Sequence, residues 1–309
     1  MRVMSIALVC SAMLACARAE ASRQPVEVEM SNVDLHVTAN ITLHIRHLRG
    51  RFEPEGTRDS PYLDDKNSYA VAVDSGVVAI DLASLNALMT ETLAGDRSNV
   101  DNIKVGIDES GNLKQKGTID KAVDIPFNVK AGVEATPDGK LRVFAKSVKG
   151  FGIPMTPLMK LFHIEMDDLL KVKPGHGVTV RDNDLILDPA MLLPAPSMRG
   201  KVTAARIEGN SIVQVFGDGA VHHMSPPAVS RNFIYWRGGT LAFGKLTMAE
   251  TDLELIDADP KDPFDFSVEH WNEQLVAGYS KTTATRGLKA HMPDYNDLKK
   301  PRQPATTKR

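Results

Sequence analysis

The sequence predicts an α+β fold in which a long, highly curved antiparallel β-sheet wraps around amphipathic helices. Two observations indicate this class. Apolar and polar residues alternate strictly over long stretches, as in strands that bury one face, and two other segments repeat apolar residues at helical spacing. The chain has 309 residues, of which 42% are hydrophobic, so it can bury a sizeable core in one large β-rich domain or two smaller ones.

Residues 1–21 are predicted to be an export signal. They combine an arginine at position 2, an apolar stretch and small residues spaced for cleavage after Ala19 or Ala21. The four residues that end at Cys16, MLAC, alternatively resemble a lipoprotein cleavage box, which would leave Cys16 as a lipidated N-terminus. Both alternatives predict a periplasmic or secreted protein, and because Cys10 and Cys16 are the two cysteines of the chain, we expect no disulfides in the mature fold.

Several segments have the alternation of half-buried strands. From Val33 to Ile45 every odd-numbered residue is apolar, which predicts one strand of about 43 Å at roughly 3.3 Å per residue. A second alternating run, 123–135, is followed by Thr136-Pro137-Asp138-Gly139, and this order of residues suits a type I turn into a return strand at 140–148. Two further hairpins are predicted over 103–119 and 201–216. These connections predict an antiparallel sheet throughout.

Two helices are expected among the strands. The first begins after Asp81, a good N-cap, and ends near Gly95, with a stripe of leucine and methionine side chains on one side. The second covers 156–171, with Thr156 as N-cap and Pro157 at its first position. Between prolines further on, Met191, Leu192 and Leu193 also require burial, which a place at the mouth of a groove would supply.

The second helix has more apolar surface than one contact with a sheet requires. We therefore predict an apolar groove between this helix and the inner face of the sheet, lined by Phe127, Val129, Val143, Leu158, Phe162 and Met166. Leu161 and Ile164 form a narrower apolar ridge on another side of the helix. That ridge either lines the same cavity or is covered by a loop or a second helix.

The composition divides the chain into sections. Residues 22–219 are predicted to form the main domain, 220–239 a linker rich in proline and glycine pairs, and 240–298 a smaller β-rich C-terminal extension. The last residues, 299–309, carry five basic and no acidic side chains, which predicts a basic disordered tail. Such a tail is either simply solvated or makes a peripheral contact with an anionic membrane surface.

The motifs between about 69 and 217 resemble those of the LmeA-like phospholipid-binding proteins, members of the tubular lipid-binding superfamily. The resemblance rests on the predicted helix at 158–170 and on four short motifs: DIPF from Asp124, ATPDGKLR from Ala135, LILDP from Leu185 and RGKVT from Arg199. It covers roughly half of the chain. It implies a long helix cradled by a curved antiparallel sheet, with a groove for a lipid acyl chain between them.

Motifs for catalysis, cofactors and metals are not found in the sequence. No G-x-S-x-G, H-E-x-x-H, P-loop or G-x-G-x-x-G motif occurs, so we expect no enzyme activity and no cofactor. The aspartates of 257–265 lack the Gly at position 6 and the acidic residue at position 12 of a calcium loop and more closely suit an acidic turn. His222-His223 is better explained as a solvated pair than as a metal site.

The expected function is therefore noncatalytic. We expect an exported protein that holds a lipid acyl chain, most simply of a phospholipid, for lipid transport or maintenance of the cell envelope. The formal net charge of −2 argues against a nucleic-acid partner. The alternative is a structural or protein-interaction β-module of the bacterial envelope with a fully packed interior.

Overall fold

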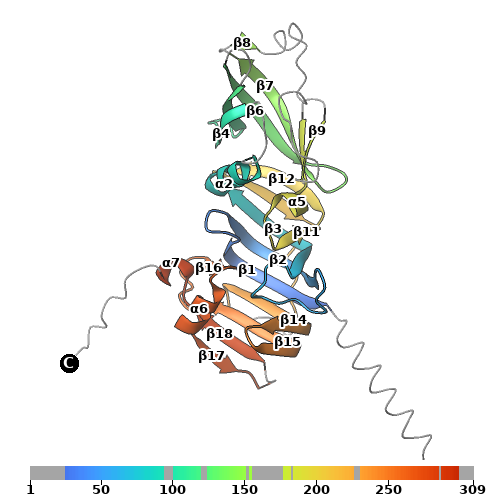
Figure 1. The fold of residues 1–309 in the computed structure, drawn as a ribbon, viewed down its shortest axis with the longest axis vertical. Coiled ribbons are helices and arrows are strands. Elements are labelled where there is room, and N and C mark those ends of the chain that lie inside the picture. The colour runs from blue at the N-terminus through green and yellow to red at the C-terminus, as the bar shows by residue number, and fades with distance from the viewer. Residues whose placement is uncertain are drawn as a thin grey trace, which may run out of the picture.

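The structure is a computed structural model that describes most of the chain between residues 25 and 298. The described ranges are 25–93, 100–119, 124–150, 153–154, 177–181, 184–225, 230–284 and 287–298. The predicted export signal, the predicted helix at 156–171 and the predicted basic tail lie outside these ranges. The described strands form two sheets that follow one another along the long axis of the molecule (Figure 1).

The large sheet has eleven strands. Nine follow the order β12-β13-β3-β2-β1-β14-β15-β18-β17, while β11 pairs with β3 and β16 pairs with β1. In chain order the strands are β1 Val26–His36, β2 Thr42–Pro54, β3 Tyr69–Asp81, β11 Ser197–Arg199, β12 Val202–Glu208, β13 Ser211–Phe216, β14 Phe233–Phe243, β15 Leu246–Asp257, β16 Phe264–Ser267, β17 Tyr279–Thr282 and β18 Leu288–Met292.

The small sheet has seven strands, in the order β4-β5-β6-β7-β10-β9, with β8 paired to β7. The strands are β4 Val100–Ile107, β5 Leu113–Ile119, β6 Ile125–Ala135, β7 Leu141–Gly150, β8 Ile153–Pro154, β9 Val178–Arg181 and β10 Asp184–Leu187. The predicted turn at 136–139 is confirmed, because the backbone N–H of Gly139 donates to the carbonyl of Thr136 at 3.0 Å. Gly139 has a φ of +87°, which glycine adopts readily.

One apolar core joins the two sheets. Alternate residues of β1, β2 and β3 point to the same side and are almost fully buried, as Val28, Leu43 and Val78 illustrate. The same cluster of packed apolar side chains includes Leu113 and Ala131 of the small sheet. The inner faces of both sheets therefore contribute to a single continuous interior.

Helix α2, Leu82–Leu93, lies where the two sheets meet (Figure 1). Its predicted N-cap is confirmed, because the Asp81 carboxylate accepts a hydrogen bond from the backbone N–H of Ser84 at 2.7 Å. The other described helices are short: α5 Pro189–Leu192, α6 Trp271–Ala277 and α7 Tyr295–Leu298. The coarse prediction of a sheet-rich α+β fold is thus confirmed, although the described strands form two sheets.

The single strand predicted from Val33 to Ile45 is wrong. The chain turns after His36 and returns as β2, so that Leu35 pairs with Leu43 and Val33 with Ile45. In each pair between β1 and β2, both residue numbers are odd or both are even. The odd-numbered side chains of the two strands therefore point to the same face of the sheet. The alternation therefore continues across the turn and hides it.

Two other expectations about connectivity also differ from the structure. The sheet is not antiparallel throughout, because β1 with β16, β3 with β11 and β15 with β18 form parallel pairs. The range 220–239, expected to be a linker, contains the first seven residues of β14, and this strand pairs with both β1 and β15. The section expected to be a separate extension therefore continues the large sheet, because β1 offers β14 a free edge on which to pair.

Candidate apolar binding site

An apolar cavity of about 110 Å³ lies where α2 and the small sheet meet. All of its described lining residues are apolar except Gln115. They are Leu85, Leu88 and Met89 of α2, Val105, Leu113, Gln115, Ala131, Val143, Val178, Leu185 and Leu187 of the small sheet, Leu192 of α5 and Ile212 of β13. The cavity is thus enclosed by residues from five regions of the sequence.

The alternation of the small sheet explains this lining. On β5, Leu113 and Gln115 face the cavity, while Lys114 and Lys116 occupy the intervening positions that face outward. On β7 and β10, Val143 pairs directly with Leu185, so their side chains share the cavity face. The helical spacing of Leu85, Leu88 and Met89 turns one stripe of α2 toward the same space.

Polar contacts fix α2 against both sheets. The side-chain amide of Asn86 donates to the carbonyl of Val105 and accepts from its N–H, both at 2.9 Å. On the large sheet, the hydroxyl of Ser84 accepts from the backbone N–H of Thr42 at 2.9 Å. These contacts hold the helix in place at the cavity without filling it.

The size of the cavity limits what it can hold. A dry engineered cavity of about 150 Å³ in another protein binds benzene, so a space of about 110 Å³ suits a group of a few carbon atoms. Left empty, it costs roughly 2–3 kcal/mol of folding stability at about 24 cal/mol per Å³. An apolar guest offsets that cost, and because Gln115 is the polar exception in the described lining, an ordered water would find few partners.

The structure locates three of the eight predicted site residues. Val143 lines the cavity between α2 and the small sheet, whereas the groove predicted for it lies against the helix at 156–171, outside the described residues. Val129 is half-buried on β6 and packs against the core next to Gln115, its cross-strand partner. Phe127 is half-buried two residues earlier, opposite Gly117, and is not among the described lining residues. The other five predicted residues, Leu158, Leu161, Phe162, Ile164 and Met166, lie outside the described residues.

Sequence reasoning missed most of the lining. The stripe on α2 is interpreted from the sequence as a packing face, and Ile212 carries no distinguishing signal. In the proline-flanked segment, Leu192 is half-buried and lines the cavity, whereas the expected burial is wrong for Met191, which is 53% exposed. Met191 is exposed because the single turn of α5 can direct only part of its surface inward.

Two other spaces have different properties. A polar depression of about 370 Å³ lies on the opposite face of the small sheet, near the β6–β7 turn. Arg142 in this depression is already paired with Glu134 at 2.6 Å and with Asp184 at 2.5 Å, so it presents no free charge to a ligand. A space of about 30 Å³ beside Trp236 in the large sheet holds at most one water molecule.

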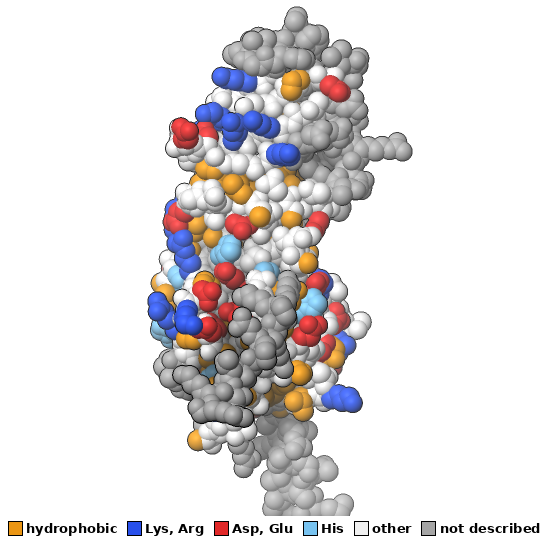
Figure 2. Space-filling model, turned by 90° about the vertical axis from the view of Figure 1, so that its left-hand side faces the viewer, with side chains coloured by type: hydrophobic (Ala, Val, Ile, Leu, Met, Phe, Trp, Pro, Cys, Tyr) orange, Lys and Arg blue, Asp and Glu red, His pale blue; other side chains and the backbone are white. Residues whose placement is uncertain are grey.

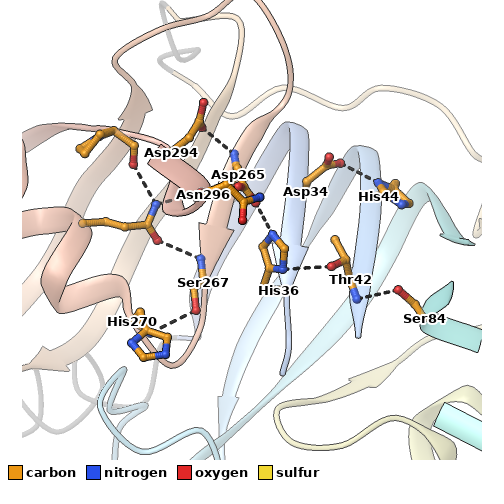
Figure 3. Close-up of polar contacts among 12 residues, drawn as sticks. Asp34, His36, Thr42, His44, Ser84, Asp265, Ser267, His270, Asp294 and Asn296 are labelled. Atoms are coloured by element: carbon orange, nitrogen blue, oxygen red, sulfur yellow. Dashed lines mark hydrogen bonds and ion pairs between the residues drawn. The ribbon is translucent and has the colours of Figure 1, made fainter. Parts of the chain in front are cut away.

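A polar network on the large sheet has the connectivity of a hydroxyl–imidazole–carboxylate relay (Figure 3). Thr42 Oγ1 lies 3.0 Å from His36 Nδ1, and His36 Nε2 contacts the carboxylate of Asp265. Thr42 lines none of the three spaces described above, and the side chains of His36 and Asp265 are only 15% and 12% exposed. We therefore assign the network a structural role, in which it joins β16 to β1.

The carboxylates of this network differ in their pKa values. Burial opposes the ionisation of Asp265, but hydrogen bonds from His36 and Asn296 outweigh it and hold the pKa of Asp265 below its ordinary value. Asp294 accepts a hydrogen bond from the Asp265 backbone N–H at 2.9 Å. Burial, reinforced by three neighbouring carboxylates, raises the pKa of Asp294 to about 7.

Within the described ranges, no group of three or more histidine, cysteine, aspartate or glutamate side chains could hold a metal ion. Asp257 instead accepts hydrogen bonds from Asn232 at 2.9 Å and from the backbone of Asp259 at 2.7 Å, as in an acidic turn. Among the described helices, none has the length and apolar character needed to cross a bilayer.

No protein-family model, curated protein or solved structure matches this chain.

Proposed function

We propose that this chain is a noncatalytic carrier or receptor for apolar chains, and that it binds the end of a lipid acyl chain in the cavity between α2 and the small sheet. The observation that carries the proposal is the cavity of about 110 Å³ whose described lining is apolar apart from Gln115. The position of Val143 in that lining is consistent with the groove expected from the sequence. The tubular lipid-binding arrangement and an exported location belong to the same proposal.

The energetics favour the end of a chain over a whole lipid tail. Burying each methylene contributes about 0.8 kcal/mol, so four or five of them contribute roughly 3–4 kcal/mol, which alone corresponds to millimolar affinity. A 16-carbon chain is much larger than about 110 Å³ can contain. Tight binding therefore requires the remaining methylenes to contact apolar surface beyond this cavity.

The proposal is tested by filling the cavity. Ala131 is buried in the lining, and its replacement by leucine adds three carbon atoms to this space. Overpacking costs about 1–3 kcal/mol, but here the added atoms occupy an existing void, so stability should remain close to that of the original protein. Binding of a fluorescent fatty acid should fall at least tenfold.

Ala204→Leu is the matched control, because Ala204 is exposed on β12 and the substitution is chemically the same. The control should bind the fatty acid like the original protein. If Ala131→Leu folds cooperatively and binds as well as Ala204→Leu, the cavity is not the site. If neither the original protein nor the control binds any apolar probe, the structural β-module is the better explanation.

A further inference from the structure

The outer face of the small sheet carries lysines arranged in two dimensions. Lys104 of β4 is directly opposite Lys116 of β5, and Lys114 of β5 is directly opposite Lys130 of β6. Along the first row, Lys116 is opposite Asn128, which is opposite Lys149 of β7. Because directly opposite residues share a face, as do residues two apart on one strand, all five lysines belong to the face that points away from the cavity.

This arrangement places like charges side by side at a cost to the fold. Neighbouring strands are about 4.8 Å apart, and like charges directly opposite one another destabilise a sheet. Lysine on the edge strand β4 can protect against edge-to-edge aggregation, but β5 and β6 are interior strands. That explanation therefore fails for Lys114, Lys116 and Lys130.

Within the part of the chain that the structure describes, one of these five lysines has a carboxylate partner. Lys130 Nζ lies 2.7 Å from the carboxylate of Asp108. Lys104, Lys116 and Lys149 are exposed, and Lys114 is half-buried. Four positive charges thus share one face of the sheet, and a layer of negative charge would relieve their mutual repulsion.

We propose that this lysine face, defined by Lys104, Lys114, Lys116, Lys130 and Lys149, docks on a bilayer that contains anionic phospholipids. Figure 2 shows basic side chains gathered on the small sheet and hydrophobic side chains just below them, at the level of α2. The face lies on the same strands that line the apolar cavity, on their other side.

A bilayer fits this face better than a nucleic acid does. Proteins that bind single-stranded DNA or RNA stack its bases on free aromatic rings. Phe144, the aromatic side chain in the described part of this face, packs its ring onto Gly132 so closely that a Cβ there would lie 2.3 Å from its Cζ atom. The ring is also flanked by the cations of Arg142 and Lys146, which leaves it poorly placed to stack on a base.

The experiment compares two triple variants of the full chain with equal net charge. Lys104→Gln, Lys114→Gln and Lys116→Gln remove charge from the lysine face. The control removes it from three exposed positions elsewhere: Arg231→Gln just before β14, Lys245→Gln in the turn between β14 and β15, and Lys281→Gln on β17. Both are sedimented with vesicles of phosphatidylglycerol in phosphatidylcholine and with vesicles of phosphatidylcholine alone. Thermal unfolding confirms that both variants fold.

Each lysine near an anionic surface contributes about fivefold to the partition coefficient, so the lysine-face variant should lose at least tenfold, and up to about a hundredfold, in vesicle binding at low salt. The control variant should bind like the original protein, and high salt should weaken both, since the Debye length falls to about 3 Å at 1 M. Equal binding by the two variants would overturn the proposal. The proposal would also be overturned if the lysine-face variant bound vesicles like the original protein but no longer bound DNA.

Failure of this proposal is distinguishable from failure of the acyl-chain proposal. Docking is measured by charge-dependent sedimentation, while the cavity is measured by Ala131→Leu and a soluble fatty acid. A protein that docks without binding the fatty acid supports the lysine face alone.

Discussion

At the scale of single residues, the fold changes the ionisation of Asp294. It lies half-buried beside Asp265 at the junction of β16 and α7, and burial raises its pKa to about 7. In the unfolded chain its pKa is close to 3.9. Between these two values the folded protein holds a proton that the unfolded chain has released, so the free energy of unfolding decreases as pH rises from about 4 to about 7.

Asp294→Asn should remove this dependence. The amide oxygen can still accept the hydrogen bond of the Asp265 N–H, and the side chain no longer has to be ionised above pH 7. We expect the variant to match the original protein near pH 4 and to be about 1–3 kcal/mol more stable at pH 8, a range reduced for partial exposure to solvent. Urea unfolding over this pH range measures the effect.

Glu250→Gln is the control for that series, because Glu250 is an exposed carboxylate on β15. Its removal should leave the slope of stability with pH between 4 and 7 unchanged. A variant at Asp294 with the same slope as the original protein would show that Asp294 ionises normally.

At the scale of elements, the position of α2 depends on Asn86. Its amide makes two hydrogen bonds to the backbone of Val105, and this pairing connects the helix to the edge strand β4. Asn86→Ala leaves both backbone groups of Val105 without these partners, at a cost of about 1–2 kcal/mol after the gain in helix propensity. Hydrogen exchange at the Val105 amide should accelerate accordingly.

Thr90→Ala on the same helix is the matched control. Its hydroxyl donates to the carbonyl of Asn86 within the helix and not to β4, so exchange at Val105 should not change. If Asn86→Ala leaves the protection of Val105 intact, the helix is held by its apolar stripe alone.

The elements also explain how far the sequence could be interpreted. Alternation and turn residues predict β6, β7 and the turn between them, and the cap at Asp81 predicts the start of α2, because these signals are local. The turn after His36 cannot be seen in the sequence, because odd-numbered residues are apolar on the strands before and after it and the alternation is not interrupted. The parallel pair of β1 with β16 depends on contacts across more than two hundred residues, and no local pattern encodes them.

The candidate site follows the same rule. Val143 is predictable because the inner face of a hairpin is evident from alternation. Leu85, Leu192 and Ile212 join it in the cavity through the meeting of two sheets, a helix and a short turn of helix. Each is a routine apolar residue in its own segment, so only the three-dimensional arrangement identifies it as lining.

At the scale of the whole molecule, the small sheet has one apolar and one basic face. Its inner face, with Leu113 and Ala131, encloses the cavity, and its outer face carries the lysines. If the protein docks on a membrane through the outer face of the small sheet, the cavity at the inner face lies near that membrane and its acyl chains. The large sheet packs against that wall through the same apolar core.

The central claim is that the cavity between α2 and the small sheet holds the end of a lipid acyl chain. Mass spectrometry of organic extracts from the purified full-length protein and from its Ala131→Leu variant tests it most directly. We predict that lipids with acyl chains accompany the original protein in near-stoichiometric amounts and are depleted at least tenfold in the variant. Equal amounts in both proteins, or no lipid in either, would contradict the claim.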